Sequence, residues 1–132
     1  MSFALTLRAY RETLGLAQYE VARLVDVRQA TWSRWEQGVR EPRDPDNVIE
    51  EMRVLASFHN DIFDAMCAFV KAQDAPRVEL GTYISDEAFC RNNEQAQAKM
   101  LPASLHRSAA AQCAYFIAAQ TGQVVEIVDA EA

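Results

Sequence analysis

Apolar residues in the first forty positions recur at steps of three and four, the spacing of one face of a helix. The stretch LTLRAYRETLG, residues 5–15, keeps this spacing up to Gly15, and AQYEVARLV, residues 17–25, repeats it. In RQATWSRWEQ, residues 28–37, Trp32 and Trp35 lie three positions apart and Gly38 follows, a residue type that commonly ends helices. The pattern therefore predicts three short helices separated by tight turns.

A longer helical pattern runs from Asp46 to about Lys71, after Asp44 and Pro45, which suit an N-cap and a first helical position. Its apolar stripe alternates steps of four and three, as in a coiled coil, with His59 at the remaining position: Val48, Met52, Leu55, Ile62, Met66 and Phe69. Such a stripe packs either on its own domain or on a partner helix. Because it is longer than three short helices would cover, we expect a partner, namely a second copy of the chain.

The pattern changes after QDAP, residues 73–76, which is typical of a linker. RVELGTYI (77–84) and QVVEIV (123–128) are rich in β-branched residues and predict strands. Between them we expect one helix after a Ser85 cap, and a second from Pro102 to Gln120 that ends at Gly122. In the second helix four residues are predicted to face inward: Leu105, Ala109, Cys113 and Phe116. Two strands form a marginal sheet alone, so pairing with a second subunit is expected.

These elements predict a mainly α-helical fold with a small α+β tail of strand, helix, helix and strand. Three parts are expected: a helix-turn-helix domain at residues 1–44, a long connecting and dimerisation helix at 45–73, and an oligomerisation or partner-binding tail at 77–132.

Charge is unevenly distributed along the 132 residues, although the net charge is -6. Residues 1–43 contain seven arginines and five acidic residues, a charge of +2, while the remainder carries -8. The cationic end can therefore meet phosphate despite the acidic total. No apolar run reaches the roughly 18 residues of a membrane span, and no secretory signal is recognisable. The three dispersed cysteines (Cys67, Cys90 and Cys113) favour small buried side chains in a reducing cytoplasm over a disulfide or zinc site.

The second and third short helices, joined by a tight turn, form the pattern of a helix-turn-helix. Val27, Trp32 and Trp35 are predicted to anchor the buried side of the third helix. The side chains predicted to project from its other faces are Arg28, Gln29, Thr31, Ser33 and Arg34. Arginine can hold guanine and glutamine can hold adenine through paired hydrogen bonds, each worth roughly 1–3 kcal/mol of discrimination. Arg40 and Arg43, after Gly38, are candidates for phosphate contacts.

The segments GLAQYEVA, DVRQATWSRWEQG and the following EP resemble the lambda-repressor/Cro-type, XRE-like helix-turn-helix family over about residues 5–57. The matching positions are Gln18, Ala22, Val27, Trp32, Trp35, Glu36 and Gly38. The resemblance implies base-facing positions at Arg28, Gln29, Ala30 and Arg34, a phosphate contact at Gln18, and a structural salt bridge between Arg11 and Glu36. Two departures stand out: Asp26 replaces the usual turn glycine, and Ala17 replaces the usual helix cap.

The sequence favours a dimeric, sequence-specific regulator of transcription, a repressor by its resemblance, that binds double-stranded DNA. We expect no catalysis, metal or cofactor, because His59 and His106 are isolated and Asp61 and Asp64 are typical of a solvated helix edge. The alternative is a phage- or antitoxin-like protein-interaction module on a helix-turn-helix scaffold, in which the arginine-bearing helix docks an acidic host protein. A third hypothesis is an antitoxin-like regulator that binds both DNA and a toxin, the toxin through the acidic C-terminal tail. The simplest interpretation of Arg28 and Arg34 is that they are ordinary surface charges. The tail, through YISDEAF and LPASLHRSAAA, resembles small YdiL-like bacterial and phage proteins, which implies a bacterial or phage origin.

Overall fold

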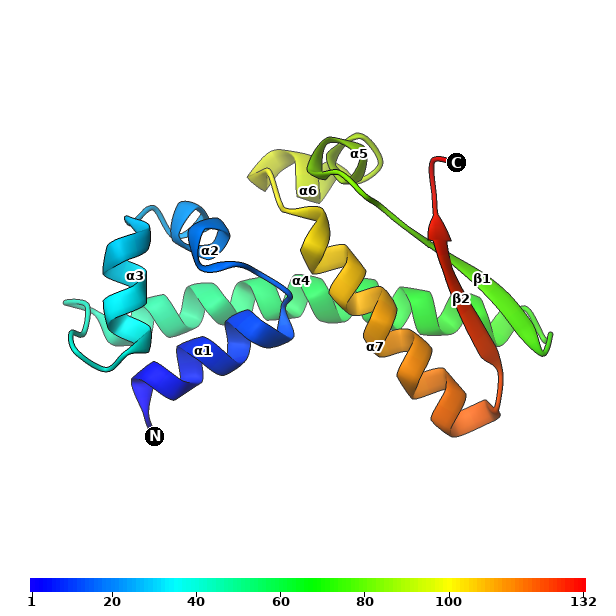
Figure 1. The fold of residues 1–132 in the computed structure, drawn as a ribbon, viewed down its shortest axis with the longest axis horizontal. Helices are drawn as coiled ribbons and strands as arrows, with labels where there is room; N and C mark the ends of the chain where they lie inside the picture. The colour runs from blue at the N-terminus through cyan, green and yellow to red at the C-terminus, as the bar shows by residue number, and fades with distance from the viewer. The chain divides into compact units, whose positions relative to one another are not determined.

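The computed structural model describes all 132 residues, which form two units, residues 1–58 and 59–132 (Figure 1). The N-terminal unit contains the three short helices and the beginning of the long one. Their bounds are α1 Phe3–Thr13, α2 Gln18–Leu24, α3 Gln29–Glu36 and α4 Pro45–Ala72. The boundary between the units falls within α4, so the predicted division into three parts stays a prediction.

Local signals in the sequence account for where these helices begin and end. Ser2 caps α1, since its hydroxyl accepts a hydrogen bond from the Leu5 N–H at 3.2 Å. Asp44 caps α4 as predicted, its carboxylate accepting from the Asn47 N–H at 3.1 Å, and Pro45 is the first helical residue. Gly38, with φ of 73°, takes the left-handed conformation that follows α3.

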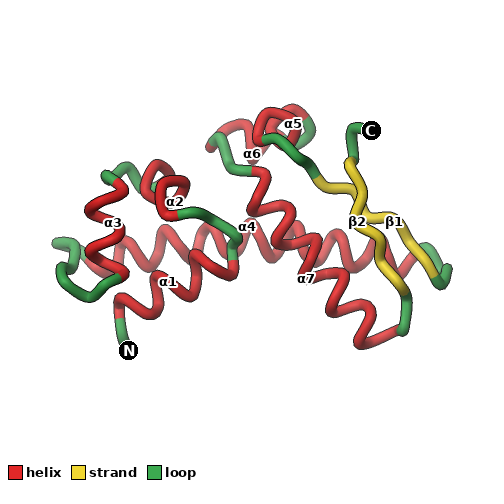
Figure 2. Tube along the Cα trace, in the orientation of Figure 1, coloured by secondary structure: helices red, strands yellow, loops and turns green.

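The C-terminal unit combines helices with a sheet of two strands (Figure 2). Its elements after α4 are β1 Arg77–Thr82, α5 Asp86–Arg91, α6 Glu94–Lys99, α7 Ala103–Thr121 and β2 Val124–Asp129. The strands pair in parallel, with Arg77 opposite Val124 and Thr82 opposite Asp129. The mainly helical fold with a small α+β tail is confirmed, with α6 as an additional short helix between the strands.

The core of the C-terminal unit lies between α4, α7 and the sheet, around Val70, Ala109, Cys113 and Ile117, all with 0% exposure. Leu105, Ala109 and Cys113 face inward as predicted, but the prediction for Phe116 is wrong, because this residue is 41% exposed. Phe116 lies one residue before the inward-facing Ile117, a rotation of roughly 100° about the helix axis, so its ring reaches only the edge of the core, where it contacts Phe63.

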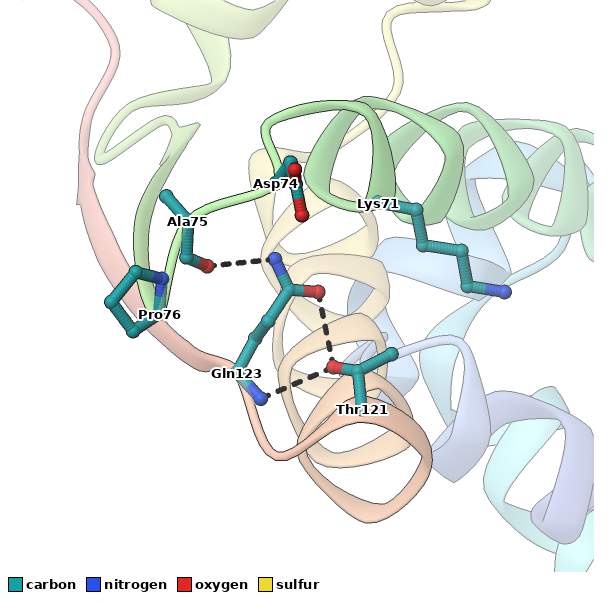
Figure 3. A pocket seen from close by; sticks show the side chains of 6 residues that line it. All are labelled: Lys71, Asp74, Ala75, Pro76, Thr121 and Gln123. Carbon is teal, nitrogen blue, oxygen red and sulfur yellow. Dashed lines mark hydrogen bonds between the residues drawn. The ribbon is translucent and has the colours of Figure 1, made fainter.

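Gln123 links the beginning of β2 to the linker that follows α4 (Figure 3). Its side-chain nitrogen donates to the carbonyl oxygen of Ala75 at 2.9 Å, and its carboxamide oxygen accepts from the Thr121 hydroxyl at 3.0 Å. These residues line an open, polar pocket of about 450 Å³ together with Lys71, Asp74 and Pro76. Since the Gln123 amide and the Thr121 hydroxyl already bond each other, we interpret these polar groups as stabilising the local backbone conformation.

The predicted dimer seam on α4 is largely buried in the single chain. Val48, Met52, Leu55 and Met66 have exposed fractions of 8% or less, and only Phe69, at 49%, is substantially exposed. The four buried side chains are therefore not available to a second copy, and Ile62, partly buried, packs against the C-terminal core. Dimerisation itself stays a prediction. None of the helices has the length and apolar character needed to cross a bilayer.

Candidate nucleic-acid interface

A turn of four residues joins α2 to α3, and Asp26 forms its bend. Asp26 has φ of 59°, a left-handed conformation of the kind that favours the glycine which it replaces at this turn position. Backbone hydrogen bonds close the turn: the Asp26 N–H donates to Arg23 at 3.2 Å and the Val27 N–H to Ala22 at 2.9 Å. The chain therefore reverses sharply enough for α2 and α3 to pack directly against each other.

Helix α2 begins without a side-chain cap at Ala17, as expected from the sequence. Glu20 offsets this, because its carboxylate accepts a hydrogen bond from the Ala17 N–H at 2.9 Å. This is one half of a capping box, whose other half requires a hydroxyl or carboxylate at the cap. The three-residue spacing of Ala17 and Glu20 is the sequence signal for this contact, which the sequence analysis does not predict.

The two tryptophans hold α3 in the N-terminal unit by its inner face. Trp32 and Trp35 are 0% and 5% exposed, and their rings lie 5.7 Å apart at a tilt of 57°. Such tilted contacts are favourable for aromatic pairs beyond the area that they bury. The predicted role of the tryptophans as core residues is confirmed, while Val27 is only partly buried.

Glu36 connects three elements through its carboxylate. It accepts hydrogen bonds from Arg11 Nε at 2.6 Å and Nη2 at 3.0 Å, from Gln18 at 3.2 Å and from the indole N–H of Trp32. Arg11 also donates to the carbonyl of Leu16 at 3.0 Å, so the salt bridge implied by the resemblance ties α1 to α3 and to the start of α2.

The electrostatics of this cluster keep both partners charged. Burial by itself would raise the pKa of Glu36, but the hydrogen bonds from Arg11, Trp32 and Gln18 together lower it. The hydrogen bond to Glu36 raises the pKa of Arg11 further above its already high value. The Arg11 and Glu36 side chains are 14% and 3% exposed, so neither charge is available to a ligand.

Within the N-terminal unit, the outer face of α3 is largely exposed. Arg28, Gln29, Ala30 and Arg34 are exposed, whereas Thr31 and Ser33 are partly buried. Arg28 is the N-cap and makes no side-chain cap, which leaves the first N–H groups of the helix unbonded by it. The Ser33 hydroxyl accepts a hydrogen bond from Gln37 at 3.2 Å, so it is the most restrained member of the predicted base-contacting set.

Four arginines in this segment, Arg28, Arg34, Arg40 and Arg43, have no hydrogen bond or ion pair. Each of the other arginines interacts with another residue: Arg8, Arg11, Arg23, Arg53, Arg77, Arg91 and Arg107. The unpaired guanidinium groups are thus confined to α3, its N-cap residue and the loop that follows the helix.

Comparison with protein families finds that residues 2–80 match the model described as a helix-turn-helix domain. The chain belongs to the helix-turn-helix domain family. No curated protein matches the chain.

Within this helix-turn-helix domain, Gln18 differs most from its predicted role. Its carboxamide donates to Glu36 instead of pointing away from the scaffold, so one of its two N–H donors is already engaged. Its contact with phosphate stays a prediction, as do the base contacts of α3 and the finer likeness to lambda-repressor/Cro-type and YdiL-like proteins. Helix-turn-helix domains place the second helix of the motif in the major groove of DNA, which makes α3 the candidate reading helix.

Proposed function

We propose that the protein is a sequence-specific DNA-binding regulator that inserts α3 into the major groove as part of a dimer. The observation that supports this most directly is the confinement of the unpaired arginines to α3, its N-cap residue and the following loop. A guanidinium with no partner in its own chain keeps all its donors for phosphate or guanine. The proposal includes no catalytic step and no cofactor.

The roles within the interface follow from position along α3. Arg28 and Gln29 lie at its amino end, which in this motif faces the base edges, and Ala30 offers a methyl group for contact with thymine. Arg34 lies in the last turn of α3. Arg40 and Arg43 lie beyond the end of the helix, and we assign them to phosphate contacts. Phosphate contacts fix the register of the protein, while base contacts discriminate between sequences.

Two copies would multiply the specificity, because one short helix reads only a few base pairs. Half-sites about one helical turn of DNA apart are the geometry that dimeric proteins of this motif use. The acidic remainder of the chain, residues 44–132 at -8, would lower binding to DNA of arbitrary sequence. A protein-interaction module that docks an acidic partner on the same arginines is the competing proposal.

Selection of bound fragments from a random DNA pool, followed by titrations at two salt concentrations, tests the proposal. Arg28→Ala should lower affinity for the selected site by roughly 10–100-fold and relax preference at one base pair. Arg40→Ala should weaken selected and random DNA equally and reduce the salt slope by roughly 0.9.

The matched control is Arg53→Ala, which removes the same charge from an exposed side chain of α4 that pairs with Glu50. It should leave the base preference unchanged. A pool that yields no enriched sequence, from protein shown to be folded by circular dichroism, would favour the protein-interaction alternative.

A further inference from the structure

The outer edge of β2 and the adjacent face of α7 form an uncharged apolar groove in the C-terminal unit. The groove has a volume of about 480 Å³ and is lined by small residues of α7, including Ala111, Ala114 and Ala118, and by Tyr115 and Ile127. Tyr115 is 81% exposed, Ile127 is 47% exposed, and the neighbouring Val124 is 45% exposed. We infer that this groove is the surface through which two copies of the chain associate, by pairing β2 with β2 of the second copy.

Only one edge of β2 has backbone N–H and C=O groups that are free to pair with another strand. The Val124 N–H donates to Pro76 at 2.8 Å and the Ala130 N–H donates to Thr82 at 2.8 Å, so even-numbered residues bond to β1. Alternate residues of a strand direct their backbone groups to opposite edges, which places those of Val125, Ile127 and Asp129 at the open edge. The sheet has no third strand that would satisfy them.

Of these odd-numbered residues, Val125 and Ile127 line the groove. In β1 the buried residues are Val78, Leu80 and Thr82, and the register places Val125, Ile127 and Asp129 opposite them. The side chains of β2 on this side of the sheet therefore extend the apolar face that β1 buries in the core, but Ile127 remains 47% exposed. A further strand at this edge would complete the cover.

Charge explains why a second copy of an acidic chain can approach here. None of the residues that line the groove is charged, although the chain carries -6. Two carboxylates at the C-terminal end of the chain are paired within it, since Glu126 pairs with Arg77 and Glu131 pairs with Arg91 at 2.6 Å, and the Asp129 carboxylate accepts a hydrogen bond from the Glu131 N–H at 2.9 Å. The groove is thus a surface on which two identical copies do not repel each other.

Symmetry and charge together select one register for the pairing. A two-fold axis through Ile127 places Ile127 opposite its counterpart, Glu126 opposite Val128, and Val125 opposite Asp129. Moving the axis by one residue, to Glu126, shifts the register by two residues and sets Glu126 opposite Glu126, and like charges directly opposite are destabilising. The axis also keeps both α7 helices on the same face of the four-stranded sheet, so that Tyr115 and the alanines of each copy meet.

The area available fits a dimer of moderate strength. Since an aromatic side chain buries about 150–250 Å², the exposed fractions of Tyr115, Val124 and Ile127 amount to roughly 300 Å² per copy. Two copies then bury roughly 600 Å² from these side chains, about half of the ~1,200 Å² at the lower end of stable interfaces. The paired strand backbones and the alanines of α7 supply the remainder.

Analytical ultracentrifugation of the full chain from low to high micromolar concentration tests the interface without DNA. The wild type should shift from monomer to dimer, whereas Ile127→Lys and Tyr115→Lys should remain monomeric. Because Tyr115 is mostly solvent-exposed, replacing it should leave the core intact, and the variant should fold. The control is Ile84→Lys, which introduces the same charge at a residue that is 78% exposed and outside the groove, and should dimerise as the wild type does.

A cysteine placed at the two-fold axis tests the register. In a Cys90→Ala background, Ile127→Cys should cross-link two copies on mild oxidation, because directly opposite residues of a hydrogen-bonded pair have Cα atoms about 5.5 Å apart. Val124→Cys should not, since the register separates the two copies of residue 124 by six positions along the strands. A wild type that stays monomeric at high micromolar concentration, lysine variants that still dimerise, or preferential cross-linking at residue 124 would overturn the inference.

The inference rests on the proposed function only in expecting two copies on one DNA site. The two fail separately: an Ile127→Lys monomer should still bind a half-site weakly and in an Arg28-dependent manner. If dimerisation is lost with no change in DNA affinity, the proposed DNA binding stands and the interface plays no part in it. A stable dimer that binds no DNA would support the interface and contradict the proposed function.

Discussion

Asp26 occupies a backbone conformation that glycine adopts at no steric cost. For other L-residues the left-handed region costs roughly 1–2 kcal/mol, and aspartate tolerates it better than most. Its carboxylate has no hydrogen bond in the structure, so no side-chain hydrogen bond offsets this backbone strain. The residue nevertheless carries a negative charge into the turn that precedes the exposed arginines of α3.

Replacing Asp26 with glycine should therefore stabilise the N-terminal unit. We expect Asp26→Gly to raise the free energy of unfolding by about 0.5–1 kcal/mol, as measured by urea denaturation, because it relieves the left-handed strain. Asp26→Ala is the matched variant: it removes the same carboxylate but keeps a Cβ, and should lower stability. Equal effects of the two changes would show that charge, rather than backbone conformation, governs this position.

At the level of elements, the N-terminal helices are held by contacts between residues distant in sequence. The carboxylate of Glu36 on α3 joins Arg11 of α1, Gln18 of α2 and Trp32 of its own helix. Because this cluster fixes the angle of α3, the outward direction of Arg28 and Gln29 depends on a buried acid that itself touches no ligand. Removal of Glu36 would leave the Arg11 charge largely buried and unpaired, the costly outcome for such pairs.

The beginning of α2 is the least complete of these elements. Since Glu20 already bonds to the Ala17 N–H, a serine at residue 17 would complete the capping box by accepting from the N–H of residue 20. Ala17→Ser should raise the midpoint of urea denaturation by an amount equivalent to roughly 0.5–1 kcal/mol. Ala65→Ser, the same change at an exposed position inside α4, should lower it slightly; a gain at both positions would refute the capping argument.

Element positions could be predicted from sequence where the signal is local. The caps at Asp44 and Ser85, the glycine exits and the tryptophan spacing all act within a few residues. Helix α6 was missed because its six residues contain a single buried side chain, Ala96, and thus no periodicity. Strand β1 ends at Thr82 rather than Ile84 because Arg107 donates to the carbonyls of Tyr83 and Ile84, a contact made from another helix.

The candidate site shows the same division between local and long-range information. The exposure of Arg28, Gln29 and Arg34 follows from helical periodicity once the tryptophans are placed inside. The engagement of Gln18 by Glu36 does not, because it joins residues eighteen positions apart. The stripe on α4 was a correct helix signal, but periodicity could not tell that the chain's own polypeptide would bury most of it.

On the scale of the whole molecule, stability depends on the chain's two histidines, of which His59 is buried and His106 is partly buried. Burial lowers the pKa of His106 to about 4, and its Nδ1 lies 2.7 Å from the hydroxyl of Thr82. Burial also lowers the pKa of His59, which is 3% exposed and whose Nε2 has no hydrogen-bond partner. Both residues belong to the C-terminal unit, so mild acid should act there before it reaches the carboxylate of Glu36.

The folded protein should accordingly lose stability as the pH falls from about 6.5 towards 4. Each histidine has a lower pKa when folded than when unfolded, so the unfolded chain binds more protons in this window and unfolding becomes more favourable. For His106 alone the expected loss between pH 7.5 and pH 5 is about 1–2 kcal/mol, measured by urea denaturation at both values. His106→Asn keeps a hydrogen-bonding group for Thr82 but cannot titrate, and should leave only the smaller pH dependence due to His59. A wild-type stability that is flat across this interval, or a His106→Asn variant with the full pH dependence, would contradict the assignment of a neutral, partly buried imidazole at this position.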